Sequence, residues 1–181
     1  INLIISTIHA VIVGFFARDF IENDSRHIWV VIFMLITVGY LMIQADKYFK
    51  GKSQIKDMGK RSALYIGVAQ ALALIPGTSR SGITMLAGRQ QGMNNQDSAE
   101  YAFLVGIPII FGASVKVMLE DSTREFVASN VGSVAVGLIV ASAVGLLVLG
   151  KLIRFVGKHG LEIFGYYRIL LGILLGIIWV V

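Results

Sequence analysis

The sequence predicts an all-α polytopic membrane protein, built from transmembrane helices and one re-entrant helical hairpin. Of the 181 residues, 56% are hydrophobic and only 15% are charged, which indicates a membrane protein rather than a soluble domain. Long apolar runs recur at the length needed to cross a bilayer, about 17–25 residues. The interval 62–92 differs, because a polar, glycine-bearing loop interrupts it. These observations together predict the fold class.

The long apolar runs predict four full crossings, preceded by a shorter fifth segment at 1–17. The four crossings are residues 27–46, 98–118, 131–150 and 163–181. Asp97 followed by Glu100 resembles a capping box and predicts that the second crossing opens at Ser98. Pro108 inside that crossing is expected to kink the helix or to free a carbonyl. Pairs of glycines at Gly88/Gly92 and Gly172/Gly176 are expected to permit close helix packing.

The chain begins inside an apolar run and has no initiator Met. No basic start or small-residue cleavage site of a signal peptide is visible. We therefore interpret 1–181 as a single integral-membrane domain that is N-terminally truncated.

The interval 62–92 contains two apolar halves that are each too short to cross a membrane. Ser62 to Ile75 would form about 21 Å of helix, and Ser81 to Gly92 about 18 Å. The hydrocarbon core is about 30 Å thick. Pro76-Gly77 separates the halves, so they form either one broken crossing or a re-entrant hairpin.

The distribution of basic residues favours the re-entrant hairpin. Loop 47–61 contains six lysines and arginines and is therefore expected in the cytoplasm. If 62–92 re-enters, loop 151–162 with its own basic residues is also cytoplasmic and loop 119–130 is outside. If 62–92 crossed, loop 151–162 would face out, against the positive-inside bias. The same clustering between apolar runs explains the pI near 9.6 without a nucleic-acid partner.

The hairpin tip is the strongest candidate site in the sequence. Its residues are Pro76-Gly77-Thr78-Ser79-Arg80-Ser81-Gly82. Irregular backbone at membrane depth is tolerated only where protein buries it or where it lines a wet cavity. An arginine there is costly in lipid and therefore indicates function.

The residue types at the tip predict phosphate or anion binding. Backbone N–H groups at the start of the second half-helix, near Ser81, lack intrahelical partners. The Arg80 guanidinium can grip a phosphoryl group in a bidentate manner, and Thr84 lies one turn further along. Thr78, Ser79 and Ser81 contribute hydroxyls, and Gly77 and Gly82 are small residues with accessible backbone N–H groups. The alternative is that the hydroxyls cap the half-helix while Arg80 pairs with a carboxylate.

Other polar residues give weaker signals. Gln70 could orient a water or a phosphate oxygen, or it could satisfy freed backbone groups. We expect Arg89, Lys116 and Arg168 to snorkel near predicted interfaces, and His9 to be a structural histidine. No pair of carboxylates is placed to hold a metal beside Arg80, and no P-loop pattern is present.

The segment from Gln70 to Thr84 resembles the second signature motif of the undecaprenyl-pyrophosphate phosphatases, written PGxSRSxxT. The following Ser98-Ala99-Glu100-Tyr101-Ala102-Phe103-Leu104, Ile107-Pro108 and Tyr167-Arg168 are also similar to that family. The resemblance extends through the whole chain. Asn95 replaces an expected basic residue and His9 replaces a usual proline, and neither departure touches the phosphate motif.

The resemblance implies a multi-pass hydrolase of the bacterial cytoplasmic (inner) membrane, with an active site open to the outer side. It would remove the terminal phosphate of undecaprenyl pyrophosphate and so recycle the lipid carrier of cell-wall synthesis. The implied architecture is an inverted repeat, of which this chain holds the second half. By position, Arg80 would grip the pyrophosphate, with Ser79, Ser81 and Thr84 around it and Gln70 nearby.

The resemblance also implies parts that this chain does not contain. The family's first motif has two glutamates, a serine and a histidine, and it is absent here. A divalent cation, Mg²⁺ or Ca²⁺, is expected to bind there, so the isolated chain is expected to be inactive. The implied partners are an isoprenoid pyrophosphate lipid and the bilayer, and a homodimer is one possible assembly. A transporter or flippase for an anionic isoprenoid lipid is the alternative function.

Overall fold

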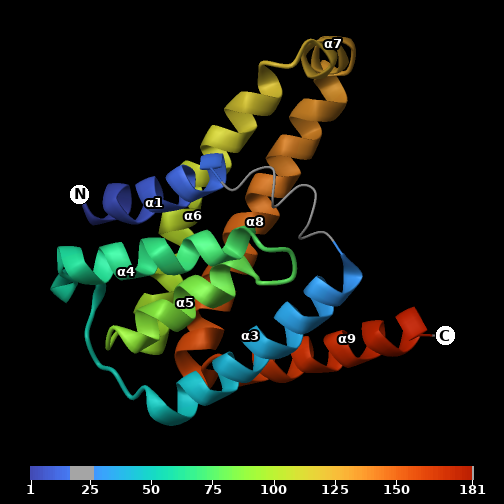
Figure 1. Ribbon diagram of the computed structural model, residues 1–181. Helices are drawn as coiled ribbons and strands as arrows, with labels where there is room; N and C mark the ends of the chain where they lie inside the picture. Colours follow the sequence, from blue (N-terminus) through green and yellow to red (C-terminus); the bar gives the residue numbers. More distant parts are fainter. Residues whose placement is uncertain (17–26, 181) are drawn as a thin grey trace.

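The computed structural model describes residues 1–16 and 27–180, and this part is helical without a β-strand (Figure 1). The helices are α1 (Asn2–Phe16), α3 (Ile28–Tyr48), α4 (Lys60–Ala71), α5 (Arg80–Gln90), α6 (Asn95–Met118), α7 (Asp121–Ser129), α8 (Val131–His159) and α9 (Glu162–Val180). Two short 3₁₀ turns, η1 (Ile55–Asp57) and η2 (Leu72–Leu74), precede and follow α4. Residue 17 of the predicted segment 1–17 and residue 181 of the predicted crossing 163–181 lie outside the described residues.

Four of these helices, α3, α6, α8 and α9, are long and apolar enough to cross a membrane. They correspond to the four predicted crossings, which confirms an all-α, multi-pass membrane protein. Helix α1, at 15 residues, lies alongside α4, where the Ser6 hydroxyl donates to the carbonyl of Ala63 at 2.7 Å.

Helix α6 begins earlier than the sequence predicted. Asn94 is its N-cap and accepts a hydrogen bond from the N–H of Asp97 at 2.8 Å. The Asn94 amide also donates to the Asp97 carboxylate. The prediction that Asp97 and Glu100 open the helix at Ser98 is therefore wrong, because Asn94 already caps it.

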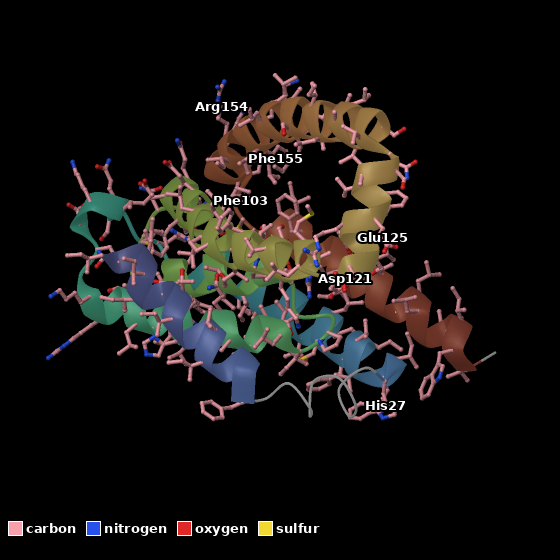
Figure 2. The ribbon with its side chains drawn as sticks, turned by 90° about the horizontal axis from the view of Figure 1, so that it is seen from above. His27, Phe103, Asp121, Glu125, Arg154 and Phe155 are labelled. Atoms are coloured by element: carbon pink, nitrogen blue, oxygen red, sulfur yellow. The ribbon has the colours of Figure 1, made fainter. Side chains whose placement is uncertain are left out.

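Two segments predicted as loops are largely helical. Helix α7 occupies most of 119–130 and joins the far ends of α6 and α8 (Figure 1). Helix α8 continues through 151–159 and ends at Gly160, whose φ of 76° terminates it. The hydropathy pattern misses this extension because its outer side is polar, although Val156 on its inner side is 1% exposed. Figure 2 shows Arg154 pointing outward while the adjacent Phe155 lies on the inner side.

Helices α3 and α9 pack antiparallel with their backbones in contact. A Cβ on Gly165 would lie 2.6 Å from the carbonyl oxygen of Gly39, and a Cβ on Gly172 would lie 2.8 Å from Ile36 Cγ1. At Gly176 the nearest atom is 3.9 Å away. The predicted Gly172/Gly176 pair thus contributes through Gly172, and the tightest approach is at Gly39 and Gly165.

The two halves of the predicted hairpin are α4 and α5, which lie side by side and antiparallel (Figure 1). Every residue of α5 from Gly82 to Arg89 is buried, because α5 also contacts α3 and α6. Met85 packs with Met42 of α3, Ala102 of α6 and Val156 of α8 in the hydrophobic core. By contrast, none of the most apolar window of α8 is buried. The hairpin's depth in the bilayer stays a prediction.

We expect Gly165→Ala to lower the free energy of unfolding by about 1–3 kcal/mol, because the new methyl would overlap the Gly39 backbone. The measurement is thermal unfolding in detergent. The control is Gly137→Ala on α8, where a Cβ meets no atom within 4 Å. Since alanine favours helix by up to about 1 kcal/mol over glycine, the control should leave the midpoint unchanged or raise it. Equal midpoints for the two variants would contradict the close approach.

Candidate functional site

The hairpin tip is a tight turn that packs against the first turn of α3. Pro76 cannot continue the preceding helix, and the N–H of Thr78 donates to the carbonyl of Ile75 at 3.2 Å. Gly77 has φ of 88°, and a Cβ on it would lie 2.7 Å from the Val31 carbonyl oxygen. The turn therefore requires glycine both for its backbone conformation and for its contact with α3.

Ser79 starts α5 in a strained conformation. It is the N-cap residue, and among the described residues it is the one non-glycine with positive φ, at 65°. Such conformations cost about 1–3 kcal/mol and cluster at functional sites. Its hydroxyl oxygen accepts from the N–H of Gly82 at 3.2 Å, so Ser79 does cap the half-helix, as one alternative proposed. The N–H groups of Arg80 and Ser81 have no hydrogen-bond partner in the described part, and they remain available to an anion.

Arg80 is half-buried and pairs with no carboxylate among residues 1–16 and 27–180. The ion pair in these residues joins Arg124 and Asp121 instead. Its guanidinium lies against α6, with Nη1 donating to the Gly106 carbonyl over a long 3.5 Å. A Cβ on Gly106 would approach Nη2 to 3.1 Å. Gly106 thus leaves room for the guanidinium, and most of its five N–H donors stay free for a ligand.

Gln70 and Thr78 are buried without hydrogen-bond partners. Each is 1% exposed, and neither the Gln70 amide atoms nor Thr78 Oγ1 find a partner in the described part. Leaving such groups unsatisfied costs about 1–3 kcal/mol apiece. Gln70 and Arg80 line the same cavity of about 90 Å³, together with apolar residues of α1 and α6. This cavity therefore contains unused donors and acceptors next to a free cation.

The remaining tip residues lie elsewhere around the start of α5. Ser79, Ser81 and Gly82 line a second cavity of about 80 Å³, whose other walls are apolar. The Thr84 hydroxyl donates to the Arg80 carbonyl at 2.7 Å. The structure thus groups Arg80 with Gln70 and Ser79 with Ser81.

Arg168 holds the tip from α9, and sequence reasoning missed this. It is only 9% exposed, and its Nη2 donates to the carbonyl oxygens of Gly77 and Thr78, the latter at 3.1 Å. The expectation that it snorkels to an interface is wrong, because the close packing of α9 on α3 directs it inward. The signal was available, since an arginine within an apolar span indicates function by the same criterion that selected Arg80.

Arg89 is also buried rather than snorkelling, with 4% of its surface exposed. Its guanidinium donates to the carbonyls of Phe49, Gly51 and Met93, the last at 2.6 Å. That expectation is therefore wrong as well. Lys116 is exposed, and His9 bonds through Nδ1 to the Ile5 carbonyl at 2.9 Å, which confirms a structural role.

The tip does not fit a divalent cation with its own residues. It offers hydroxyls, one amide, backbone N–H groups and arginines, whereas Mg²⁺ and Ca²⁺ require oxygen ligands that include carboxylates. In the described ranges, no group of three or more His, Cys, Asp or Glu is placed to hold a metal.

Comparison with known proteins places the chain in a family. The family model described as bacitracin resistance protein BacA matches residues 1–174. The chain belongs to this family. Its relatives include proteins named undecaprenyl-diphosphatase from Alcanivorax borkumensis (37% identity, 94% of this chain and 64% of the relative) and Clavibacter michiganensis subsp. michiganensis (37%, 96% and 63%). A third, from Thermodesulfovibrio yellowstonii, is 36% identical over 98% of this chain and 68% of its own length. The chain thus spans slightly less than two thirds of the first two BacA relatives.

The contact between Arg168 and the tip predicts the exchange behaviour of the tip amides. We expect Arg168→Met to accelerate hydrogen exchange over residues 78–83 by about tenfold or more, since it removes two hydrogen bonds from a charged donor. Exchange monitored by mass spectrometry measures this. Arg154→Met, which changes an outward-pointing arginine (Figure 2), is the control and should leave these amides unaffected. Unchanged exchange in Arg168→Met would mean that the tip keeps its conformation without the hydrogen bonds from Arg168.

Proposed function

We propose that the protein containing this chain hydrolyses undecaprenyl pyrophosphate to undecaprenyl phosphate and inorganic phosphate, recycling the lipid carrier of cell-wall synthesis. The observation that carries this is Arg80, whose guanidinium has no counter-ion among the described residues and lies beside Gln70 and N–H groups that lack partners there. BacA family membership and the names of the relatives support the same reaction.

In the proposed mechanism the chain's residues bind and orient the terminal phosphate. Water attacks this phosphorus, the phosphoanhydride bond breaks, and undecaprenyl phosphate leaves. Negative charge on the phosphoryl oxygens is stabilised by a bidentate Arg80 and by the N–H groups that start α5. Ser79 and Ser81 contribute hydroxyls, and Gln70 orients a phosphate oxygen or the water.

The other predicted site residues shape the tip rather than react. Gly77 permits the turn against α3, and Gly82 gives its N–H to the Ser79 cap. The Thr84 hydroxyl donates to the carbonyl of Arg80, and the buried Thr78 hydroxyl has no partner among the described residues. A divalent cation, Mg²⁺ or Ca²⁺, would neutralise phosphate charge, and its ligands would come from outside the described residues.

The position of the tip supports an active site that opens to the outer side of the bacterial cytoplasmic membrane. The tip contacts Val31 near the start of α3, whereas Lys47 and the other basic residues of loop 47–61 follow its opposite end. By the positive-inside rule we expect that basic end in the cytoplasm. A re-entrant hairpin from 62 to 92 is consistent with this placement.

The alternative is a transporter or flippase for an anionic isoprenoid lipid. It is favoured by one observation, that no carboxylate or histidine of the described residues lines either tip cavity, where a general base would have to lie. A transporter would leave the pyrophosphate whole, so release of inorganic phosphate by the intact protein separates the two functions.

Substitutions of Arg80 test the proposed hydrolase. In the intact protein, Arg80→Ala should lower phosphate release from a prenyl pyrophosphate in detergent at least about a hundredfold without unfolding. Arg80→Lys should also fail largely, because a point charge cannot replace the bidentate fork. Arg154→Lys is the matched control and should retain activity. Near-normal turnover of Arg80→Lys would refute bidentate binding.

Gln70→Met separates a substrate role from a structural one. Because the amide has no partner among the described residues, an apolar side chain of similar size should leave the thermal midpoint unchanged or raise it. Turnover should nevertheless fall, about tenfold or more, if Gln70 orients the phosphate or water. A lowered midpoint with normal turnover would instead mean that Gln70 supports the backbone.

A further inference from the structure

A second polar site lies at the opposite end of α3 from the tip. The end of α3, the α8–α9 junction, Arg89 of α5 and Asn95 of α6 enclose a cavity of about 660 Å³, here called the basic-end pocket. Asp46 in this pocket is 15 residues along α3 from Val31 beside the tip, which is roughly 22 Å of helix. The basic-end pocket is therefore separate from the Arg80 site.

The basic-end pocket has more positive than negative side chains. Four cations line it, Lys47, Lys50, Arg89 and Lys158, against the two carboxylates of Asp46 and Glu162. Each carboxylate already has one oxygen engaged at the start of α9. Asp46 accepts from the N–H groups of Leu161 and Glu162, and Glu162 accepts from the Tyr166 hydroxyl at 2.9 Å. The pocket therefore favours an anionic ligand.

Arg89 makes this positive charge a fixed part of the fold. It is 4% exposed, and three backbone carbonyls hold its terminal nitrogens. Its Nε has no partner in the described part of the chain. Asp46 is close enough to attract this guanidinium, but burying a cation among carbonyls is still costly, and an anion that approaches Arg89 would lower that cost.

The pocket also has three oxygen acceptors without donors. Gln44 Oε1, Asp46 Oδ1 and Asn95 Oδ1 are buried and have no hydrogen-bond partner among the described residues. A metal ion on these oxygens would be repelled by the four surrounding cations. A ligand that fits must therefore be negatively charged and must also bear hydroxyl groups that can donate.

We propose that the basic-end pocket binds the headgroup of an anionic glycerophospholipid that bears free hydroxyls, such as phosphatidylglycerol. Its phosphate would lie among Lys47, Lys50 and Lys158, and its hydroxyls would donate to Gln44, Asp46 and Asn95. A phosphodiester supplies the charge, and basic pockets between helices at the cytoplasmic side suit such headgroups.

The surroundings of the pocket favour a lipid over a soluble phosphate. Tyr166 lines the pocket and is 57% exposed. Tyrosines are enriched at membrane–water interfaces, where their rings lie at headgroup depth. The helices that line the pocket, α3 and α9, also have exposed apolar side chains, including Leu41 and Ile163, that can contact acyl chains. This inference does not depend on the proposed hydrolysis.

Native mass spectrometry of the intact protein in detergent tests the proposal. Wild type should retain phosphatidylglycerol in preference to phosphatidylcholine, and to phosphatidylmethanol, which has the same charge but no headgroup hydroxyl. Lys47→Gln with Lys158→Gln should weaken phosphatidylglycerol binding by about tenfold or more. Lys56→Gln with Lys60→Gln is the control, because it makes the same charge change at exposed residues outside the pocket.

Three outcomes would overturn the proposal. Equal losses in the two double variants, with circular dichroism unchanged, would mean general surface attraction. Equal retention of phosphatidylmethanol would refute the role of Gln44, Asp46 and Asn95. Displacement of the lipid by millimolar glycerol phosphate or inorganic phosphate would assign the pocket to a soluble phosphate instead.

Discussion

The structure depends on backbone carbonyls that accept hydrogen bonds from buried and half-buried arginines. Arg168 binds the carbonyls of the turn at 77–78, and Arg80 binds that of Gly106. Arg89 binds two carbonyls in the loop after α3 and one just after α5. Each cation thereby joins elements that are distant in sequence. Because a carbonyl is a weaker acceptor than a carboxylate, Arg80, with its single long bond, keeps the capacity to bind an anion.

The three arginines differ in how fully their donors are used, and this difference separates support from function. Arg168 and Arg89 hold irregular segments where the helices break, so their substitution should loosen the fold locally. Arg80 has one long contact, and next to it Gln70 and Thr78 have unused polar atoms. The strained Ser79 fixes the direction in which α5 starts. Support from α9 and unused donors on α5 together make the tip a preorganised site.

Much of this arrangement was predictable from the sequence, because it follows from local patterns. Apolar runs located the four crossings, and Pro76-Gly77 located the hairpin. The inward positions of Arg168 and Arg89 were not predictable in this way, because they depend on how closely α9 approaches α3 and how loop 49–53 packs on α5. The start of α6 and the extension of α8 were missed because Asn94 and Val156 act through capping and core contact rather than through hydropathy.

The complete burial of α5 has a consequence for how the protein responds to its membrane. Residues 82–89 contact protein on all sides, whereas the apolar window of α8 has no buried residue. We therefore expect a thicker or thinner bilayer to change the tilt of α8, whose apolar window is uncovered in the described chain, more than the position of α5. The tip takes its position from α3, α6 and α9. Its geometry is consequently insulated from bilayer thickness, and one set of contacts can serve in membranes of different lipid composition.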